Sequence, residues 1–309
     1  MAVVRRMAAS LGVAVFASCR TVPPRPDAVH RTGDEIVVAG QRFHTGTRVI
    51  TWQDPEGYNA YRGEPPLAPR QAATSLSPGE IARAKARGWD VPLLQEMVDQ
   101  FVLHYDACGL SKICFNTLHA RGLSVHFLLD VDGTVYQTLD LQERALHATS
   151  SNDRSIGIEI ANLGAYPSAE TKTLDEWYQR DAGGSLAIKV PKKVGDAGIR
   201  TKDFIGRPAR MTPVRGAVQG RELVQYDFTP EQYAALAKLT AALCEVFPRI
   251  KCDFPRDRSG RLVTGKLPEA ELANYRGILG HFHIQENKTD PGPAFQWHRL
   301  IEDARQQMK

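Results

Sequence analysis

MVDQFVLHY, residues 97–105, is the stretch of the sequence that decides the fold. It mixes β-branched and aromatic residues over the length of one strand. His104 stands at the end of this strand. We therefore predict a strand that ends in a histidine, and we take His104 as a candidate functional residue.

A helix and a hairpin follow this strand. A short helix is predicted over residues 111–121, and Gly122 is expected to end it. The runs 125–131 and 134–139 flank Asp132-Gly133, which is the strongest short-range signal for a two-residue hairpin turn. We expect these two runs to pair as antiparallel strands.

A further strand is predicted over residues 155–161. Side chains alternate between the two faces of a strand, so three apolar residues share one face: Ile156, Ile158 and Ile160. Glu159 then lies on the other face with Gly157, where a small neighbour leaves room for substrate. This placement argues against an exposed carboxylate on an edge strand at Glu159.

The C-terminal third supplies two helices and a last strand. Thr229, Pro230 and Gln232 form a helix N-cap, a proline at the first helical position and a capping-box glutamine. The helix they start is predicted to run to about Phe247. A strand near 278–282 and a final helix from Pro293 complete an α/β domain, in which helices flank a mixed central β-sheet.

The chain divides into three parts by composition. Residues 1–18 predict an export signal, residues 19–74 a proline-rich linker with an accessory strand or hairpin, and residues 75–309 the main domain. Residues from about 164 to 225 show no sustained period and carry many lysines and arginines. We expect them to be a basic insertion whose charges are solvated, with a lip that faces an acidic substrate as the alternative.

Composition and charge narrow the function classes. The 309 residues are 42% hydrophobic and 24% charged, as in a soluble globular protein. A net charge of +4 and a pI of 8.8 are too mild for a nucleic-acid-binding protein. They are compatible with an acidic polymer as partner, and we expect a monomer.

The N-terminus predicts export. Arg5 and Arg6 precede a short apolar run that ends in small residues and is too short to span a bilayer. Phe16-Ala17-Ser18-Cys19 resembles a bacterial lipoprotein signal, in which the cysteine is acylated and becomes the mature N-terminus. The resemblance implies a lipid anchor at Cys19 and, from Arg20, retention at the periplasmic face of the outer membrane. An ordinary secretory signal with a soluble periplasmic product is the alternative.

Without Cys19, an even number of cysteines remains: Cys108, Cys114, Cys244 and Cys252. In an oxidising compartment this predicts two disulfides, and local pairing is the simplest connectivity. No CxxC spacing occurs, so we do not expect a zinc site built on thiolates.

Two segments carry the residue types of a hydrolytic metal site. A catalytic zinc takes about three protein ligands and keeps one position open. The end of the first strand supplies His104, and Gly280-His281-Phe282-His283 is followed by Lys288-Thr289-Asp290-Pro291-Gly292-Pro293. Lys288 and Asp290 are two residues apart, so in an extended segment both point to the same side.

Together with four other segments, these two resemble a known family. The four are Ser124-Val125-His126-Phe127, residues 132–137, His147-Ala148 and residues 155–159. In this order they closely resemble the type-2 N-acetylmuramoyl-L-alanine amidases, which share a fold with the peptidoglycan recognition proteins. The resemblance covers about residues 97–162 and 275–300, and it implies one zinc ion per chain and peptidoglycan or muropeptides as the substrate.

Carried over residue by residue, the resemblance implies zinc ligands at His104, His281 and Asp290. It places Glu159 and Lys288 beside the zinc-bound water. The chemistry of amide hydrolysis agrees, because a carboxylate takes the proton of the water and a cation stabilises the oxyanion. The spacing of Cys108 and Cys114 also resembles a disulfide of the recognition proteins.

Three other histidines have alternative interpretations. The loop between His281 and Lys288 is one residue shorter than in similar family members, so His283 is a rival ligand that faces the same way in a strand. His126 and His147 are candidate substrate contacts, with a hydrogen-bonded core position as the alternative for both.

We therefore expect zinc-dependent hydrolysis of the amide bond between N-acetylmuramic acid and L-alanine. One alternative is a binding module of the same fold that recognises cell wall without cutting it. Another is a zinc amidase or peptidase that acts on a different substrate.

Overall fold

The computed structural model describes residues 31–63, 67, 70 and 77–308. The predicted export signal and Cys19 lie outside the described residues. Residues 32–309 group into one compact unit. No helix among the described residues is long and apolar enough to cross a membrane.

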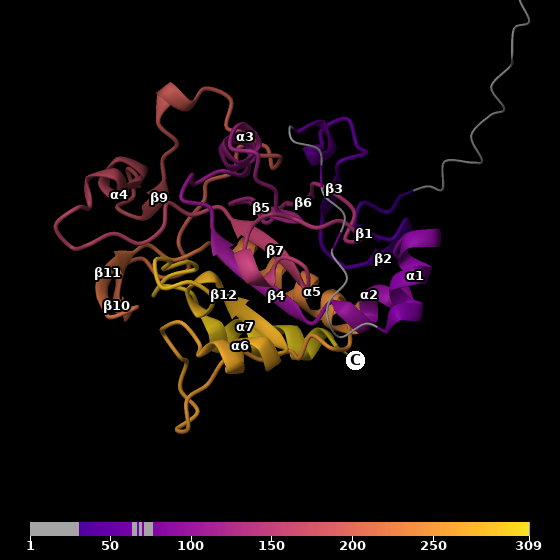
Figure 1. The fold of residues 1–309 in the computed structure, drawn as a ribbon. Coiled ribbons are helices and arrows are strands. Elements are labelled where there is room, and N and C mark those ends of the chain that lie inside the picture. Colours follow the sequence, from indigo (N-terminus) through magenta and orange to yellow (C-terminus); the bar gives the residue numbers. More distant parts are fainter. Residues whose placement is uncertain (1–30, 64–66, 68–69, 71–76, 309) are drawn as a thin grey trace, which may run out of the picture. The chain divides into compact units, whose positions relative to one another are not determined.

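A six-stranded mixed sheet forms the centre of this unit (Figure 1). Its order is β12 (Gly277–Gly280), β4 (Gln100–Tyr105), β7 (Ser155–Ile160), β5 (Phe127–Leu129), β6 (Val135–Gln137) and β3 (Val49–Thr51). All neighbours are parallel except β5 and β6. The predicted fold class is confirmed. The predicted strand at 97–105 begins only at Gln100. Met97, the first residue of the predicted strand, is instead the last residue of helix α2 (Val91–Met97), which Asp90 caps.

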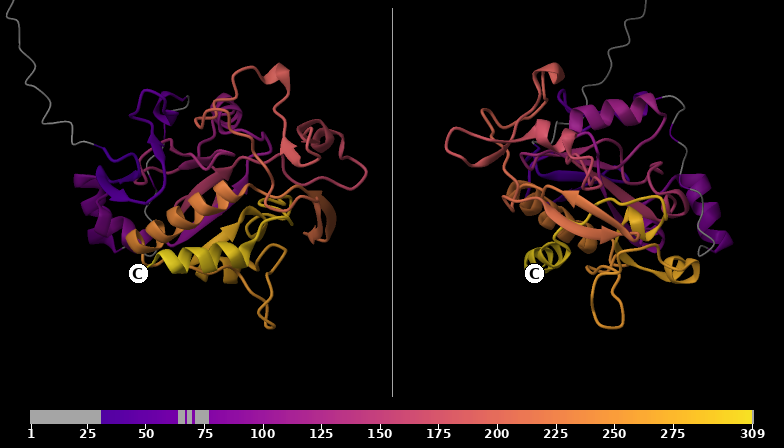
Figure 2. Two further views of the ribbon diagram at one scale, coloured as in Figure 1. Left: turned by 180° about the vertical axis from the view of Figure 1, so that it is seen from behind. Right: turned by 90° about the vertical axis from the view of Figure 1, so that its left-hand side faces the viewer.

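The two faces of the sheet are covered by different helices (Figures 1 and 2). One face packs against α5 (Pro230–Val246) and α7 (Trp297–Gln307). The other meets α3 (Ser111–Ala120) and α6 (Glu269–Asn274). Ile156, Ile158 and Ile160 belong to the core under α5 and α7, as predicted. Strand alternation therefore turns Glu159 toward the opposite face.

Local capping explains where α5 begins. Thr229 accepts from the backbone N–H of Gln232, whose side chain accepts from the backbone N–H of Thr229. This is the capping box that the sequence predicted. Further helices are α1 (Pro78–Arg87) and the 3₁₀ turns η1 (Ala60–Arg62) and η3 (Lys192–Val194).

The hairpin of β5 and β6 has a longer turn than predicted. Asp130 and Thr134 still pair through their backbones, so three residues form the loop rather than two. Gly133 takes a φ of 80°, the left-handed conformation that closes a three-residue hairpin loop. The Asp-Gly signal thus located the hairpin correctly but assigned it the wrong loop length.

The segment before residue 75 is more than a linker with an accessory strand. It forms a hairpin, β1 (Glu35–Val38) and β2 (Gln41–His44), and β3 is the edge strand of the central sheet, paired with β6. Ile36 and Val38 are fully buried in the main core. The domain therefore begins near residue 32 rather than 75, because these short apolar runs are buried only by pairing with residues about 100 positions away.

The region 164–225 is also more ordered than an irregular insertion. It contains α4 (Lys172–Trp177), the hairpin β8 (Tyr178–Arg180) with β9 (Leu186–Ile188), and the hairpin β10 (Val214–Val218) with β11 (Arg221–Gln225). Leu174, Trp177 and Leu186 form a small apolar cluster with Leu163. This cluster gives the first hairpin a core of its own.

A buried carboxyl in the β5–β6 turn links stability to pH. Asp130 is fully buried, and its Oδ2 has no hydrogen-bond partner among the described residues. Burial raises the pKa of Asp130 to about 7. An unfolded aspartate titrates near pH ~4, so the folded protein binds one extra proton between about pH 4 and 7. The free energy of unfolding therefore falls as the pH rises through this window.

We predict that Asp130→Asn removes the contribution of Asp130 to this pH-dependent loss of stability. The contribution is on the order of 2–4 kcal/mol, at about 1.4 kcal/mol per pKa unit. Urea unfolding of both proteins between about pH 3 and 8, roughly one unit beyond each end of this window, measures the difference. Asp203→Asn, at an exposed position, is the matched control. An equal pH slope in wild type and Asp130→Asn contradicts the prediction.

Candidate active site

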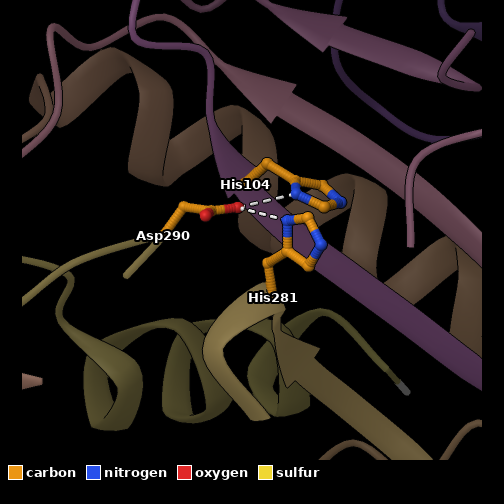
Figure 3. A group of neighbouring side chains, drawn as sticks. All are labelled: His104, His281 and Asp290. Atoms are coloured by element: carbon orange, nitrogen blue, oxygen red, sulfur yellow. Dashed lines mark hydrogen bonds and ion pairs between the residues drawn. The ribbon is translucent and has the colours of Figure 1, made fainter. Parts of the chain in front are cut away.

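Three side chains from separate elements meet at one end of the sheet (Figure 3). His104 lies near the end of β4, His281 opens the 3₁₀ turn η4 (His281–His283) directly after β12, and Asp290 lies in the following loop. Asp290 Oδ2 is 2.7 Å from His104 Nδ1 and 3.0 Å from His281 Nδ1. All three residues are buried, and their candidate ligand atoms lie within 4.8 Å of one another.

Hydrogen bonds on the far side of each imidazole are compatible with a tautomer in which the Nδ1 atom that faces Asp290 is unprotonated. Nε2 of His281 lies 2.5 Å from Gln285 Oε1, which is an acceptor, so this nitrogen carries the proton. Nε2 of His104 lies 3.0 Å from His147 Nδ1, and His147 Nε2 lies 3.2 Å from Ser155 Oγ. If His147 donates to Ser155, it accepts from His104, and the Nδ1 atoms of both His104 and His281 are free to bind a metal.

The resulting arrangement can hold a cation. Burial, together with the nearby charge of His281, lowers the pKa of His104 to about 4, so His104 is neutral at pH 7. Burial opposes ionisation of Asp290, but the two histidines hold its pKa below the ordinary value. In the tautomer with both Nδ1 atoms unprotonated, two neutral nitrogens and a carboxylate oxygen form a set of three acceptors that suits a cation. Two imidazoles and one carboxylate fit zinc and leave a fourth position open.

His283 is excluded from this group by its own hydrogen bonds. Its Nδ1 accepts from the backbone N–H of Gly280 at 2.9 Å, and its Nε2 lies 2.7 Å from the carbonyl of Val263. The predicted strand at 278–282 ends at Gly280, so His281 and His283 lie in a 3₁₀ turn and point in different directions. The assumption that both face the same way was wrong.

Glu159 and Lys288 line the same cavity as the three residues, which has a volume of about 630 Å³. Glu159 is the register partner of His104 on the adjacent parallel strand, so both side chains leave the same face of the sheet. Burial raises the pKa of Glu159 well above its ordinary value, and the charges of Asp290 and Asp106 add to this effect. Such a carboxyl is suited to accept and release a proton.

His147 and His126 form a layer behind His104. His147 lines the cavity and also contacts His104 Nε2, so it positions a candidate ligand. His126 is fully buried: its Nδ1 accepts from the N–H of Gly157, and its Nε2 lies 3.1 Å from the carbonyl of Glu143. The structure therefore corrects the predicted substrate contact of His126 to a core position.

Gly157 leaves room for a side chain of the protein rather than for substrate. A Cβ atom at this position would lie 2.5 Å from the ring of His147. The ring packs directly on the backbone of β7, and only glycine permits this approach. The predicted open space beside Glu159 is thus filled by the histidine that supports His104.

Arg70 lies behind these histidines and was not found from the sequence. Its buried guanidinium donates to four backbone carbonyl groups and lies 3.0 Å from His126 Nε2. The carbonyl groups are those of Leu141, Asn152, Asp153 and Ser155. The segment after β6 is thereby tied to the loop that leads into β7. An arginine in a proline-rich segment carries no sequence signal of this kind, because its partners are backbone carbonyls and one histidine that are distant in sequence.

Two glutamines of the β10–β11 hairpin hold the segments that carry His281 and Asp290. Gln225 Nε2 donates to the carbonyl of Pro291 at 3.0 Å, and its Oε1 accepts from the N–H of Ala294 at 2.9 Å. Gln219 Nε2 donates to the carbonyls of Phe282 and Gln285 at 2.7 and 3.0 Å. The hairpin belongs to the predicted insertion, so part of this insertion supports the candidate metal site.

We predict that Gln225→Ala lowers zinc affinity about 10- to 100-fold, the usual effect of losing a group that orients metal ligands. The substitution leaves the Pro291 carbonyl and the Ala294 N–H without their buried partner, so the loop that carries Asp290 loosens. Competition with a chelating dye measures the affinity. Glu222→Ala, at an exposed position of the same strand, is the control. Unchanged zinc affinity would limit Gln225 to a role in folding.

The cavity extends from the three residues along α3. Thr117, Leu118 and Arg121 line this arm. The side chains of Arg121 and Lys288 form no hydrogen bond or ion pair with any residue that the structure describes. They are the free positive charges of the cavity and favour a ligand with carboxylates.

The four cysteines lie in the predicted pairs. The structure has them as free thiols, with Cys108 hydrogen-bonded to Cys114 and Cys244 to Cys252. Both disulfides stay predictions, which peptide mapping under non-reducing conditions decides.

Comparison with solved structures finds several amidases and recognition proteins. AmpD, as a selenomethionine derivative, is 18% identical over 82% of this chain and 98% of its own, with a TM-score of 0.37. The E. coli amidase AmiD, in complex with anhydro-N-acetylmuramic acid-L-Ala-D-gamma-Glu-L-Lys, is 17% identical over 87% of this chain and 65% of its own, with a TM-score of 0.39. Drosophila peptidoglycan recognition protein SA is 14% identical over 67% and 79%, with a TM-score of 0.31.

A comparison with curated protein sequences finds no match. The family model described as N-acetylmuramoyl-L-alanine amidase matches residues 94–293, which include every residue of the site described above except Arg70 and Ala294. This match covers more than half of the chain, and the chain therefore belongs to the N-acetylmuramoyl-L-alanine amidase family.

Proposed function

We propose that this protein is a zinc-dependent hydrolase that cuts the amide bond between N-acetylmuramic acid and the L-alanine of the peptidoglycan stem peptide. The observation that carries the proposal is the convergence of two buried imidazole nitrogens on one carboxylate oxygen. Glu159 and Lys288 line the same cavity and supply the other two groups that amide hydrolysis needs.

Each residue has a distinct task. Zinc, when held by His104, His281 and Asp290, polarises the scissile carbonyl and lowers the pKa of a water molecule to about 7. Glu159 takes a proton from the attacking water oxygen and passes it to the leaving amide nitrogen. Lys288 Nζ places a positive charge beside the carbonyl oxygen as that oxygen becomes negative.

A binding module of the same fold needs neither a proton acceptor nor an open metal position. Here the carboxyl of Glu159 is half-buried, lines the cavity and forms no hydrogen bond with any described residue. A partly desolvated carboxyl with no structural partner costs stability, so its presence favours catalysis over binding alone.

Digestion of purified peptidoglycan tests the proposal. The expected products are free stem peptides that begin with L-alanine and glycan strands with unsubstituted lactyl groups, both identified by mass spectrometry. Elemental analysis of the same sample should find one zinc per chain rather than iron. Binding to peptidoglycan without release of peptide would support the binding module, and cleavage at a different bond would assign another amidase or peptidase activity.

We further propose that the protein is anchored at the periplasmic face of the outer membrane by acylation of Cys19. The support is the signal sequence alone: a charged start, a short apolar run and small residues lead directly to this cysteine. We predict that the full-length protein partitions with membranes and that Cys19→Ser is neither acylated nor retained there. Equal membrane retention of Cys19→Ser contradicts the lipid anchor.

A further inference from the structure

A second cavity, of about 870 Å³, adjoins the metal-site cavity. It lies between the 3₁₀ turn η2 (Thr149–Ser151), helix α6 and residues 284–287. Thr149, Gln285 and Asn287 line both cavities. A ligand whose reacting bond lies at the metal site can therefore extend in two directions, along α3 or into the second cavity.

The basic side chains of the second cavity are already paired with acids. Arg154 donates to both carboxylate oxygens of Asp99, at 2.5 and 2.6 Å. Lys266 Nζ lies 3.8 Å from Glu286 Oε1. The fourth charged residue of the lining, Glu269, is acidic. This cavity has no free positive charge among the described residues, so it does not favour a carboxylate.

The remaining lining suits a neutral polar ligand with an apolar side. The hydroxyls of Thr149 and Ser150 and the amide of Asn287 are exposed, and their side chains form no hydrogen bond within the described part of the chain. Leu272 and Ile284 supply an apolar surface. Small-molecule sites of about 300–1,000 Å³ commonly combine a few polar groups with such a surface.

Backbone strain marks the junction of the two cavities. Thr149 has a φ of 44°, in the left-handed region that a β-branched residue seldom adopts. This conformation persists where the surrounding structure enforces it, and such positions cluster at ligand-binding sites. Gln285, on the opposite side of the junction, uses its Oε1 to hold His281 and leaves its amide nitrogen without a partner among the described residues.

We propose that the second cavity binds the neutral N-acetylated amino sugar linked to muramic acid in the glycan strand. The inference rests on the proposed function, because it assumes that the amide next to muramic acid lies at the metal site. On one side of that amide the substrate is a neutral saccharide, and on the other it is a peptide with carboxylates. The free charges of Arg121 and Lys288 place the peptide along α3, and the second cavity receives the saccharide.

The test compares two soluble substrates that carry the same stem peptide, one on N-acetylmuramic acid and one on the disaccharide N-acetylglucosaminyl-N-acetylmuramic acid. We expect kcat/KM to be about tenfold higher for the disaccharide, mainly through a lower KM. This is the difference that about two net hydrogen bonds provide. Ala273→Trp should bring this ratio close to one, because Ala273 lines the cavity and indole fills it. Ala270→Trp, on the same helix but outside the lining, should keep the ratio.

A ratio near one in the wild type, or an unchanged ratio in Ala273→Trp, overturns the proposal. Calorimetric titration of zinc-loaded protein with the disaccharide alone is independent of cleavage. Wild type and Ala270→Trp should bind it, and Ala273→Trp should bind it about tenfold more weakly. If Ala273→Trp instead weakens binding of the free stem peptide, the cavity holds the peptide. If neither substrate is cut, the amidase proposal fails, and the titration still decides what the cavity binds.

Discussion

Asp290→Ala is expected to lose bound zinc and catalytic activity together. Its Oδ2 is the single atom on which both imidazoles converge, at 2.7 and 3.0 Å. Without the carboxylate, two neutral histidines remain, and two ligands do not hold a catalytic zinc. We expect zinc affinity to fall by more than the ~100-fold that loss of an orienting group causes, and turnover to fall to background.

Zinc content after dialysis and release of stem peptide from peptidoglycan measure the two losses. His283→Ala is the control that distinguishes a metal ligand from a neighbouring histidine. It removes a buried side chain with two hydrogen bonds, so the protein should unfold at a lower temperature. It should nevertheless retain one zinc per chain. An Asp290→Ala protein that keeps zinc and full activity would contradict the assignment of Asp290 as a ligand. A His283→Ala protein that folds without zinc would contradict the exclusion of His283.

Glu159→Gln is expected to keep zinc and lose about 10²- to 10⁴-fold in turnover, the usual contribution of a positioned general base. Glutamine has nearly the same shape as glutamate but cannot take the proton of the attacking water. Glu159 forms no hydrogen bond with any described residue, so the substitution leaves no new unpaired partner. The fold and the three candidate ligands should therefore be undisturbed.

Single-turnover kinetics at saturating substrate measure the loss, with zinc content and thermal stability determined on the same samples. Glu176→Gln, at an exposed position of α4, is the matched control and should behave as wild type. Wild-type turnover by zinc-loaded Glu159→Gln would refute the base assignment. Loss of zinc from Glu159→Gln would instead make Glu159 a ligand.

Much of the fold was predictable because its signals are local. The capping box at Thr229 needs only residues three apart, and the side-chain alternation of β7 needs only the period of a strand. The position of the β5–β6 hairpin follows from Asp132-Gly133. Signals of this kind lie within a few residues of the structure that they specify, so one sequence is enough to read them.

The edges of the domain were not predictable in the same way. β3 is too short to stand out as a strand of the central sheet, and its place there comes from pairing with β6, more than 80 residues later. Gln219 and Gln225 lie in a region without any periodic pattern. Their importance depends on backbone groups near residues 282–294, which the hairpin reaches only in the folded protein.

The sequence by itself determined the fold class and, through its resemblance to a family, the residues His104, Asp290, Glu159 and Lys288. Only the tertiary structure decided between His281 and His283. The backbone leaves the strand at Gly280 and turns, which directs His281 to Asp290 and buries His283 against Val263. A metal site depends on distances between atoms far apart in sequence, and packing of the whole domain sets those distances.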